Sequence, residues 1–271
     1  MLAPMIDAVG GVGPDVRPTV LVAVPAHDES ERVVSCLASV HAALRFAEQA
    51  GTIADGFVAV AAHRCRDATA TLAGQFLAEV DRRHVVWVAA ETASVGAVRT
   101  ALIARAVRSA GESPTWLFST DADTQVPLTW VTDGLRLASD DAADLVLGLV
   151  ELNELAVDAP ARLAHDRLVA GGLRPGGGHD HVYAANLLVR YAAYLAVGGF
   201  PDVRHGEEHG LRTAVRAAGY RVLSTRALVV RTSGRMEGRA SFGLHAVLAA
   251  LAATPQPEDS GSPFDRAVVD G

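Results

Sequence analysis

Short apolar runs alternate with longer segments of helical periodicity along the first half of the chain. The apolar runs predict strands at 19–25, 57–62, 84–90 and 115–120. The segments between them predict helices at 30–50, from 67 onward and at 94–111, the last with Ser94 as N-cap and Gly111 as its stop. Because the strand runs are continuous rather than alternating, we expect parallel strands covered on both faces.

The second half has a mixed pattern. It predicts helices at 127–139 and 161–172, and strands at 143–152 and 181–189. Polar and glycine-rich or proline-rich ends predict a flexible leader at 1–17 and a disordered tail at 254–271, so that one folded domain covers 18–253. The chain is therefore expected to be an α/β protein with a mostly parallel central sheet flanked by helices.

Composition narrows the class of protein. Half of the 271 residues are apolar and the net charge is -7, which fits a globular domain and disfavours nucleic acid as a partner. Two cysteines, Cys36 and Cys65, have no paired spacing, so we expect neither a disulfide framework nor a thiolate metal site. A reducing cytoplasm is the expected location.

The apolar segment at 244–253, LHAVLAALAA, is about half a bilayer span in length. We therefore expect no transmembrane helix. An ordinary core-facing helix is the main interpretation of this segment, and peripheral membrane contact through it is the alternative.

Two carboxylates follow the fourth predicted strand, at Asp121 and Asp123 in the stretch WLFSTDADTQVP. Residues i and i+2 of an extended chain point the same way, so both acids could converge on one hard cation. Magnesium and manganese prefer oxygen ligands and keep waters and substrate phosphates in their shells, which suits a site with few protein ligands. The alternative is that the two acids only cap a turn or the next helix.

Four segments in order resemble the family-2 glycosyltransferases of GT-A fold, from about residue 19 to 235. They are VLVAVPAHDESERVVSCLASV, FVAVAAHRCRDATATLA, WLFSTDADTQVPLTWV and HVYAANLLVRYAAYLAVGGFPDVRHGEEHGLRTAVRAAGYRV. The resemblance implies a GT-A-like, Rossmann-like fold with a nucleotide half at about 18–125 and a mixed acceptor half at about 126–253. It also implies a nucleoside diphosphate sugar donor and an acceptor hydroxyl of unknown identity.

Carried over by position, the resemblance implies a nucleotide site. Asp67 would touch the base, while Gly96 and Arg99 would lie near the pyrophosphate and Asp121 would also face the nucleotide. The nucleoside pocket would be lined by Pro25, Ala26, His27 and Glu29. The alternative for Glu29 and Asp67 is favourable charge at a helix N-terminus, and for Arg99 an exposed position without a role.

The resemblance also implies the catalytic groups of a sugar transfer with inversion. Asp121 and Asp123 would hold Mg2+ or Mn2+, with Asp123 as the direct ligand, and the cation would stabilise the departing diphosphate. Glu208 of GEEHGL would be the general base and Glu207 its orienting or acceptor-binding partner, the alternative being a solvated helix start. Three further residues would face the acceptor or the diphosphate: Asn186, Arg231 and Arg235. Asn186 would face the sugar, the alternative being a strand-edge amide. Arg231 stands where the family usually has a histidine, and both arginines could bind the diphosphate directly.

Two rival functions remain open. The first is a degenerate domain that binds a sugar nucleotide or a partner without turnover. It is favoured by two differences from the family pattern, the altered second motif AAHRC and the absent histidine. HGEEH at 205–209 formally matches H-x-x-E-H, an inverted zinc-peptidase motif that needs a helix through His205 and His209. A dinucleotide oxidoreductase is disfavoured, because no G-x-G-x-x-G follows the first strand.

Overall fold

The computed structural model describes residues 17–90, 94–152, 163, 166–167 and 169–233. Contacts divide the chain into two units, Met1–Asn153 with Leu173–Ser233, and Glu154–Gly172 with Gly234–Gly271. In the second unit the described residues 163, 166–167 and 169–171 are helical, as the periodicity predicts. Except for Arg17, the predicted leader lies outside the described residues, as do the tail, the segment 244–253 and Arg235.

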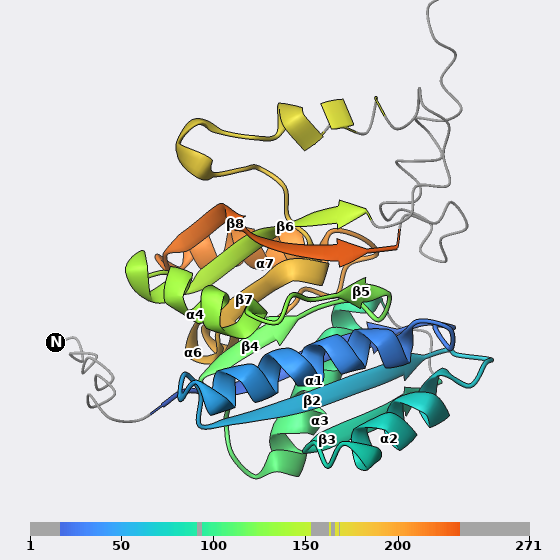
Figure 1. Cartoon of the computed structure of the whole chain (residues 1–271). Coiled ribbons are helices and arrows are strands. Elements are labelled where there is room, and N and C mark those ends of the chain that lie inside the picture. Colours follow the sequence, from blue (N-terminus) through green and yellow to red (C-terminus); the bar gives the residue numbers. More distant parts are fainter. Residues whose placement is uncertain (1–16, 91–93, 153–162, 164–165, 168, 234–271) are drawn as a thin grey trace, which may run out of the picture. The chain divides into compact units, whose positions relative to one another are not determined.

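The first unit is built on one eight-stranded sheet in the order β3-β2-β1-β4-β7-β6-β8-β5 (Figure 1). Strands β1 to β4 are mutually parallel, whereas β7 runs antiparallel to β4 and β6, and β5 antiparallel to β8. The mostly parallel first half and mixed second half are therefore confirmed. The strands are β1 Thr19–Ala26, β2 Asp55–His63, β3 His84–Ala89, β4 Trp116–Ser119, β5 Thr124–Gln125, β6 Leu145–Leu152, β7 Leu187–Arg190 and β8 Val222–Thr232.

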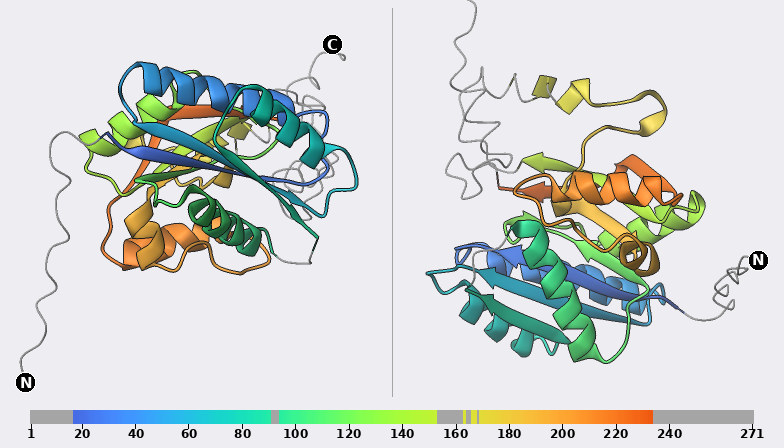
Figure 2. Two further views of the ribbon diagram at one scale, coloured as in Figure 1. Left: turned by 90° about the horizontal axis from the view of Figure 1, so that it is seen from below. Right: turned by 180° about the vertical axis from the view of Figure 1, so that it is seen from behind.

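Helices cover both faces of the sheet, as two further views show (Figure 2). The side chains of β1 alternate between the two layers: Val20, Val22 and Val24 belong to one apolar cluster, and Leu21 and Ala23 to the other. The first cluster includes residues of α1 Val33–Gln49, α2 Thr69–Glu79 and α4 Trp130–Asp140. The second includes residues of α3 Val95–Ala110, α6 Tyr191–Ala196 and α7 Glu207–Ala217.

The continuous apolar runs of β1 and β2 are explained by this double cover, because every second side chain enters a different core. None of the described helices is both long and apolar enough to span a bilayer.

The predicted strand at 181–189 forms only in part. A short 3-10 turn, η2 Ala184–Asn186, precedes β7. The turn brings the fully buried Asn186 into the core, where its Oδ1 accepts from Trp130 Nε1 at 2.9 Å. Its Nδ2 donates to the carbonyls of Leu149 and Leu228, at 2.8 and 3.0 Å.

The expectation that Asn186 faces the sugar is therefore wrong, because its amide satisfies buried backbone and indole groups instead. Gly148 leaves the space that this amide needs, since a Cβ there would stand 2.2 Å from Asn186 Nδ2.

We expect Asn186→Ala to lower the free energy of unfolding by about 3 kcal/mol, because it leaves an indole N–H and two carbonyls buried without partners. Urea unfolding followed by tryptophan fluorescence measures the change. Arg136→Gln is the control, since it removes only exposed pairs with Asp133 and Asp140 and should cost less than about 1 kcal/mol. Equal effects of the two substitutions would show that the Asn186 contacts are not structural.

Candidate functional site

The carboxyl ends of β1, β2 and β4 meet at one edge of the sheet, because the three strands are parallel neighbours. The residues that follow these strands carry the polar groups named from the sequence. In open α/β sheets this edge is where ligands bind.

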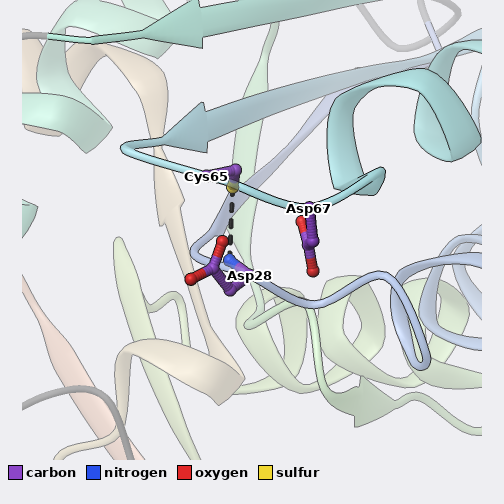
Figure 3. A group of neighbouring side chains, drawn as sticks. All are labelled: Asp28, Cys65 and Asp67. Carbon is purple, nitrogen blue, oxygen red and sulfur yellow. Dashed lines mark hydrogen bonds between the residues drawn. The ribbon is translucent and has the colours of Figure 1, made fainter.

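The ends of β1 and β2 are tied together by side chains. Asp28 adopts a left-handed conformation, with φ of 52°, and its backbone N–H donates to Cys65 Sγ at 3.2 Å (Figure 3). Arg66 N–H donates to Asp28 Oδ1 at 2.6 Å, and this hydrogen bond lowers the pKa of Asp28. His27 Nδ1 lies 2.6 Å from the carbonyl oxygen of His63.

Asp67 connects the two following helices. Its Oδ2 accepts from Ser30 N–H at 3.0 Å and its Oδ1 from Thr69 N–H at 3.0 Å, while the Thr69 hydroxyl accepts from Glu29 N–H at 2.7 Å. Burial opposes ionisation of Asp67, but the hydrogen bonds from Thr69 and Ser30 outweigh it and lower its pKa. The predicted base-binding carboxylate is thus an exposed, ionised acceptor held in a fixed orientation.

One group of acid and thiol side chains on this edge is close enough for a metal ion. Single ligand atoms of Asp28, Cys65 and Asp67 lie within 4.8 Å of one another (Figure 3). Burial raises the pKa of the Cys65 thiol, however, and a neutral thiol is a poor ligand. Both carboxylates already accept backbone N–H groups, so the three side chains act chiefly to hold the loops together.

Asp121 and Asp123 lie in a turn rather than in an extended segment. Strand β4 ends at Ser119, and Thr124 N–H donates to the Asp121 carbonyl at 3.0 Å. The i, i+2 rule applies to an extended chain, so the expectation that the two side chains point the same way is wrong for this turn. They bind to different elements: Asp121 pairs with Arg99, and Asp123 Oδ1 accepts from Thr232 Oγ1 at 3.0 Å.

Arg99 joins the end of β4 to the start of α7. Its Nη2 donates to Asp121 Oδ1 and its Nη1 to Ser119 Oγ, both at 2.6 Å, and its Nε lies 3.5 Å from Glu207 Oε1. The side chain is only 3% exposed and its guanidinium lies over the Phe200 ring. Burial alone would favour loss of its proton, but Asp121 and Glu207 outweigh burial and raise the pKa of Arg99.

Arg99 is therefore neither an exposed residue without a role nor one whose guanidinium reaches out toward a pyrophosphate. It is a buried cation between acids that the sequence places far apart.

The first turn of α3 fits closely against the loop before α7. Ser94 caps the helix by accepting from Ala97 N–H, as predicted. A Cβ on Gly96 would stand 2.3 Å from the Pro201 carbonyl oxygen and 2.9 Å from Glu207 Cβ. The close approach that Gly96 allows is thus to Pro201 and Glu207, and it places Glu207 beside Arg99, which lies three residues along the same helix.

Glu207 and Glu208 open α7, directly after Gly206 in the left-handed region. Burial, followed by repulsion from Glu207, raises the pKa of Glu208 from 4.5 to about 7. The alternative of a solvated helix start is therefore wrong for Glu207, which is 7% exposed.

His205 lies outside α7 and His209 inside it, so no helix runs through both. The zinc-peptidase interpretation of HGEEH is therefore wrong.

Arg231 lies on β8 beside Thr232, and neighbouring strand residues face opposite ways. Its Nε pairs with Glu151 Oε2 at 3.4 Å on an exposed surface, whereas Thr232 faces Asp123. The structure does not bring Arg231 to the two aspartates.

Pro25 and Ala26 are the last two residues of β1, which ends one residue later than predicted, and the Ala26 carbonyl accepts from the Cys65 thiol at 3.5 Å.

Four residues of the site were missed from the sequence: Asp28, Cys65, Ser119 and Thr232. All four follow or end a strand, which was the available signal, although nothing in their spacing shows the partner of each one.

No protein-family model matches the chain, and no curated protein sequence does. Solved structures do match. The mannosyltransferase PcManGT from Pyrobaculum calidifontis, in complex with GDP-Man and Mn2+, superposes with a TM-score of 0.60 over 83% of this chain at 16% identity. TarS 1-349 from S. aureus, in complex with UDP-GlcNAc, superposes with a TM-score of 0.58 over 82% of this chain at 15% identity.

The chain has a glycosyltransferase fold. This confirms the GT-A-like architecture expected from the sequence. The chain spans about three fifths of the length of these two proteins, covering 59% of PcManGT and 60% of TarS 1-349.

The raised pKa of Glu208 predicts that stability falls as pH rises. The folded protein holds this proton up to about pH 7, whereas the unfolded chain releases it near the ordinary value of 4.5. The folded state therefore binds more protons between these two pKa values, and its advantage is lost as pH rises through that window. Denaturant unfolding at several pH values between about 5 and 8 should show this slope.

Glu208→Gln should be less dependent on pH over the same range, because glutamine does not titrate. Glu31→Gln, at a side chain that is 84% exposed, is the control and should keep the wild-type slope. Identical slopes in all three proteins would mean that Glu208 titrates normally.

Proposed function

We propose that this chain is a glycosyltransferase that moves a sugar from a nucleoside diphosphate donor to an acceptor hydroxyl with the help of a divalent cation. The observation that carries the proposal is the ion-pair cluster on Arg99. It brings Asp121, from the D-x-D turn, and Glu207, from the glutamate pair, to one guanidinium at the ligand-binding edge of the sheet.

The donor set suits a hard cation. Asp123 offers a partly buried carboxylate at the turn, and oxygen ligands of this kind bind Mg2+ or Mn2+ together with water and phosphate oxygens. When bound, the cation would stabilise negative charge on the departing diphosphate. PcManGT, determined with GDP-Man and Mn2+, supports both a divalent cation and a nucleoside diphosphate sugar donor. TarS 1-349, determined with UDP-GlcNAc, supports the donor class.

The nucleoside would lie against the joined ends of β1 and β2. The exposed Asp67 carboxylate can accept an N–H of the base or a ribose hydroxyl. His27 and Glu29 lie on the loop that follows β1. Thr69 and Cys65 bind the backbone of this loop and hold it against the end of β2.

Glu208 would take the proton from the acceptor hydroxyl. The hydroxyl oxygen bonds to the anomeric carbon, the bond from that carbon to the diphosphate oxygen breaks, and the acceptor proton passes to the Glu208 carboxylate. A base works best when its pKa is near the operating pH, and the pKa of Glu208, raised to about 7, meets that condition. An acceptor attack from the face opposite the leaving group gives inversion.

The test is a thermal-shift screen of nucleoside diphosphates with and without Mn2+. We expect at least one diphosphate to raise the Tm only when Mn2+ is present, because a ligand that binds the folded state stabilises it. Asp123→Asn should remove most of this shift. Asp140→Asn, at an exposed helix end, is the control and should leave the shift unchanged.

Transfer or hydrolysis of a labelled nucleotide sugar then separates an enzyme from a degenerate binding domain. Binding without any turnover would favour the degenerate domain, and no Tm response to any diphosphate would contradict both.

A further inference from the structure

Two acidic pairs lie in this site, Asp121 with Asp123 and Glu207 with Glu208, and the two members of each pair are not equivalent. Asp121 and Glu207 form ion pairs with the buried Arg99. Their chain neighbours Asp123 and Glu208 have different surroundings: Asp123 accepts from the neutral hydroxyl of Thr232, and Glu208 is one residue beyond the paired Glu207 on α7. One guanidinium thus takes one carboxylate from each acidic pair.

We propose that Arg99 is a positioning residue that binds Asp121 and Glu207 as its own counter-ions, and thereby leaves Asp123 as the cation ligand and Glu208 as the proton acceptor. This inference rests on the proposed function. It departs from the expectation that Asp121 and Asp123 share the cation, and from the expectation that Arg99 contacts the pyrophosphate.

The burial of Arg99 makes this pairing obligatory. A guanidinium that is 3% exposed needs charge compensation, because an uncompensated buried charge is far more costly than a paired one. Ser119 Oγ accepts a further N–H at 2.6 Å, and the Phe200 ring, 5.8 Å from the guanidinium carbon, covers one face. These contacts orient the planar guanidinium toward Asp121 on one side and Glu207 on the other.

The backbone around Arg99 keeps the two acids in place. Gly96 lets the first turn of α3 approach Glu207 Cβ, and Thr100 Oγ1 donates to the Phe200 carbonyl at 3.2 Å. Gly96, Arg99 and Thr100 are spaced at i, i+3 and i+4, so one face of α3 makes all of these contacts. A cation that binds Asp121 would have to compete with the ion pair between Asp121 and Arg99, at 2.6 Å.

The decisive variant is Arg99→Met, measured by titration of Mn2+ without nucleotide. Loss of the guanidinium leaves the Asp121 and Glu207 carboxylates without their counter-ion, so we expect Mn2+ to bind about tenfold more tightly than to the wild-type protein. The gain should disappear in Arg99→Met/Asp121→Asn, and Arg99→Lys, which restores a cation, should return toward the wild-type affinity. A merely structural role for Arg99 predicts weaker binding, not tighter.

The matched control is Arg105→Met. It removes an arginine from the same helix and changes the net charge equally, but Arg105 lies over the Trp87 ring rather than among the acids. Its Mn2+ affinity should equal that of the wild-type protein. Unchanged or weaker Mn2+ binding by a folded Arg99→Met protein, as judged by circular dichroism, would overturn the proposal, as would an equal gain in Arg105→Met.

A second comparison does not depend on the folding of the Arg99 variant. With Mn2+ and a nucleoside diphosphate, Asp121→Asn should keep Mn2+ affinity within about threefold of wild type, whereas Asp123→Asn should lose more than about tenfold. Equal losses would mean that both acids are ligands and would overturn the proposal. If no nucleoside diphosphate binds but the Mn2+ gain of Arg99→Met is seen, only the glycosyltransferase function fails.

Discussion

The buried positive charge of Arg99 connects the parallel half of the sheet to the two acidic segments of the site. Arg99 is on α3, in the parallel half, and its counter-ions come from the turn after β4 and from the first residue of α7. The pair with Glu207 is buried, with side-chain exposures of 3% and 10%, and removing one partner of such a pair costs about 3–5 kcal/mol. The Asp121 carboxylate is 40% exposed, so its pair with Arg99 restrains the turn after β4 less strongly. The charge requirement therefore acts as a geometric restraint on the residues proposed for chemistry.

The restraint works because the first turn of α3 is unusually close to the loop before α7. Gly96 has no side chain to separate the two backbones, and Ser94 Oγ donates to Asp202 Oδ1 at 2.6 Å while it caps the helix. Two left-handed glycines, Gly198 and Gly199, turn the chain so that Phe200 reaches the guanidinium. A local backbone feature thus supports each long-range contact.

Much of this architecture could be predicted from the sequence. Continuous apolar runs identified β1 to β4, and Ser94 and Gly111 marked the ends of α3, because such signals are local. The placement of acids at the strand ends followed from the same reasoning.

The partners of the functional side chains could not be predicted in this way. Arg99 contacts Asp121 and Glu207 across 22 and 108 positions, and Asn186 meets Trp130 across 56, so no periodicity records these pairs. From the sequence, a solvated helix start is the alternative for Glu207, and Asn186, within a predicted strand, is expected to face the sugar. Only the tertiary packing shows that both are buried.

The end of β8 shows how strand alternation separates two neighbouring side chains. Arg231 stands where the glycosyltransferases that the sequence resembles often have a histidine, and the alternation of the strand turns Arg231 toward Glu151 and Thr232 toward Asp123. The Thr232 hydroxyl fixes the orientation of the Asp123 carboxylate. Hard cations bound by few carboxylates complete their shells with water and phosphate oxygens. On the proposed function, the cation and the donor diphosphate would therefore bind together, because the diphosphate oxygens supply ligands to the cation.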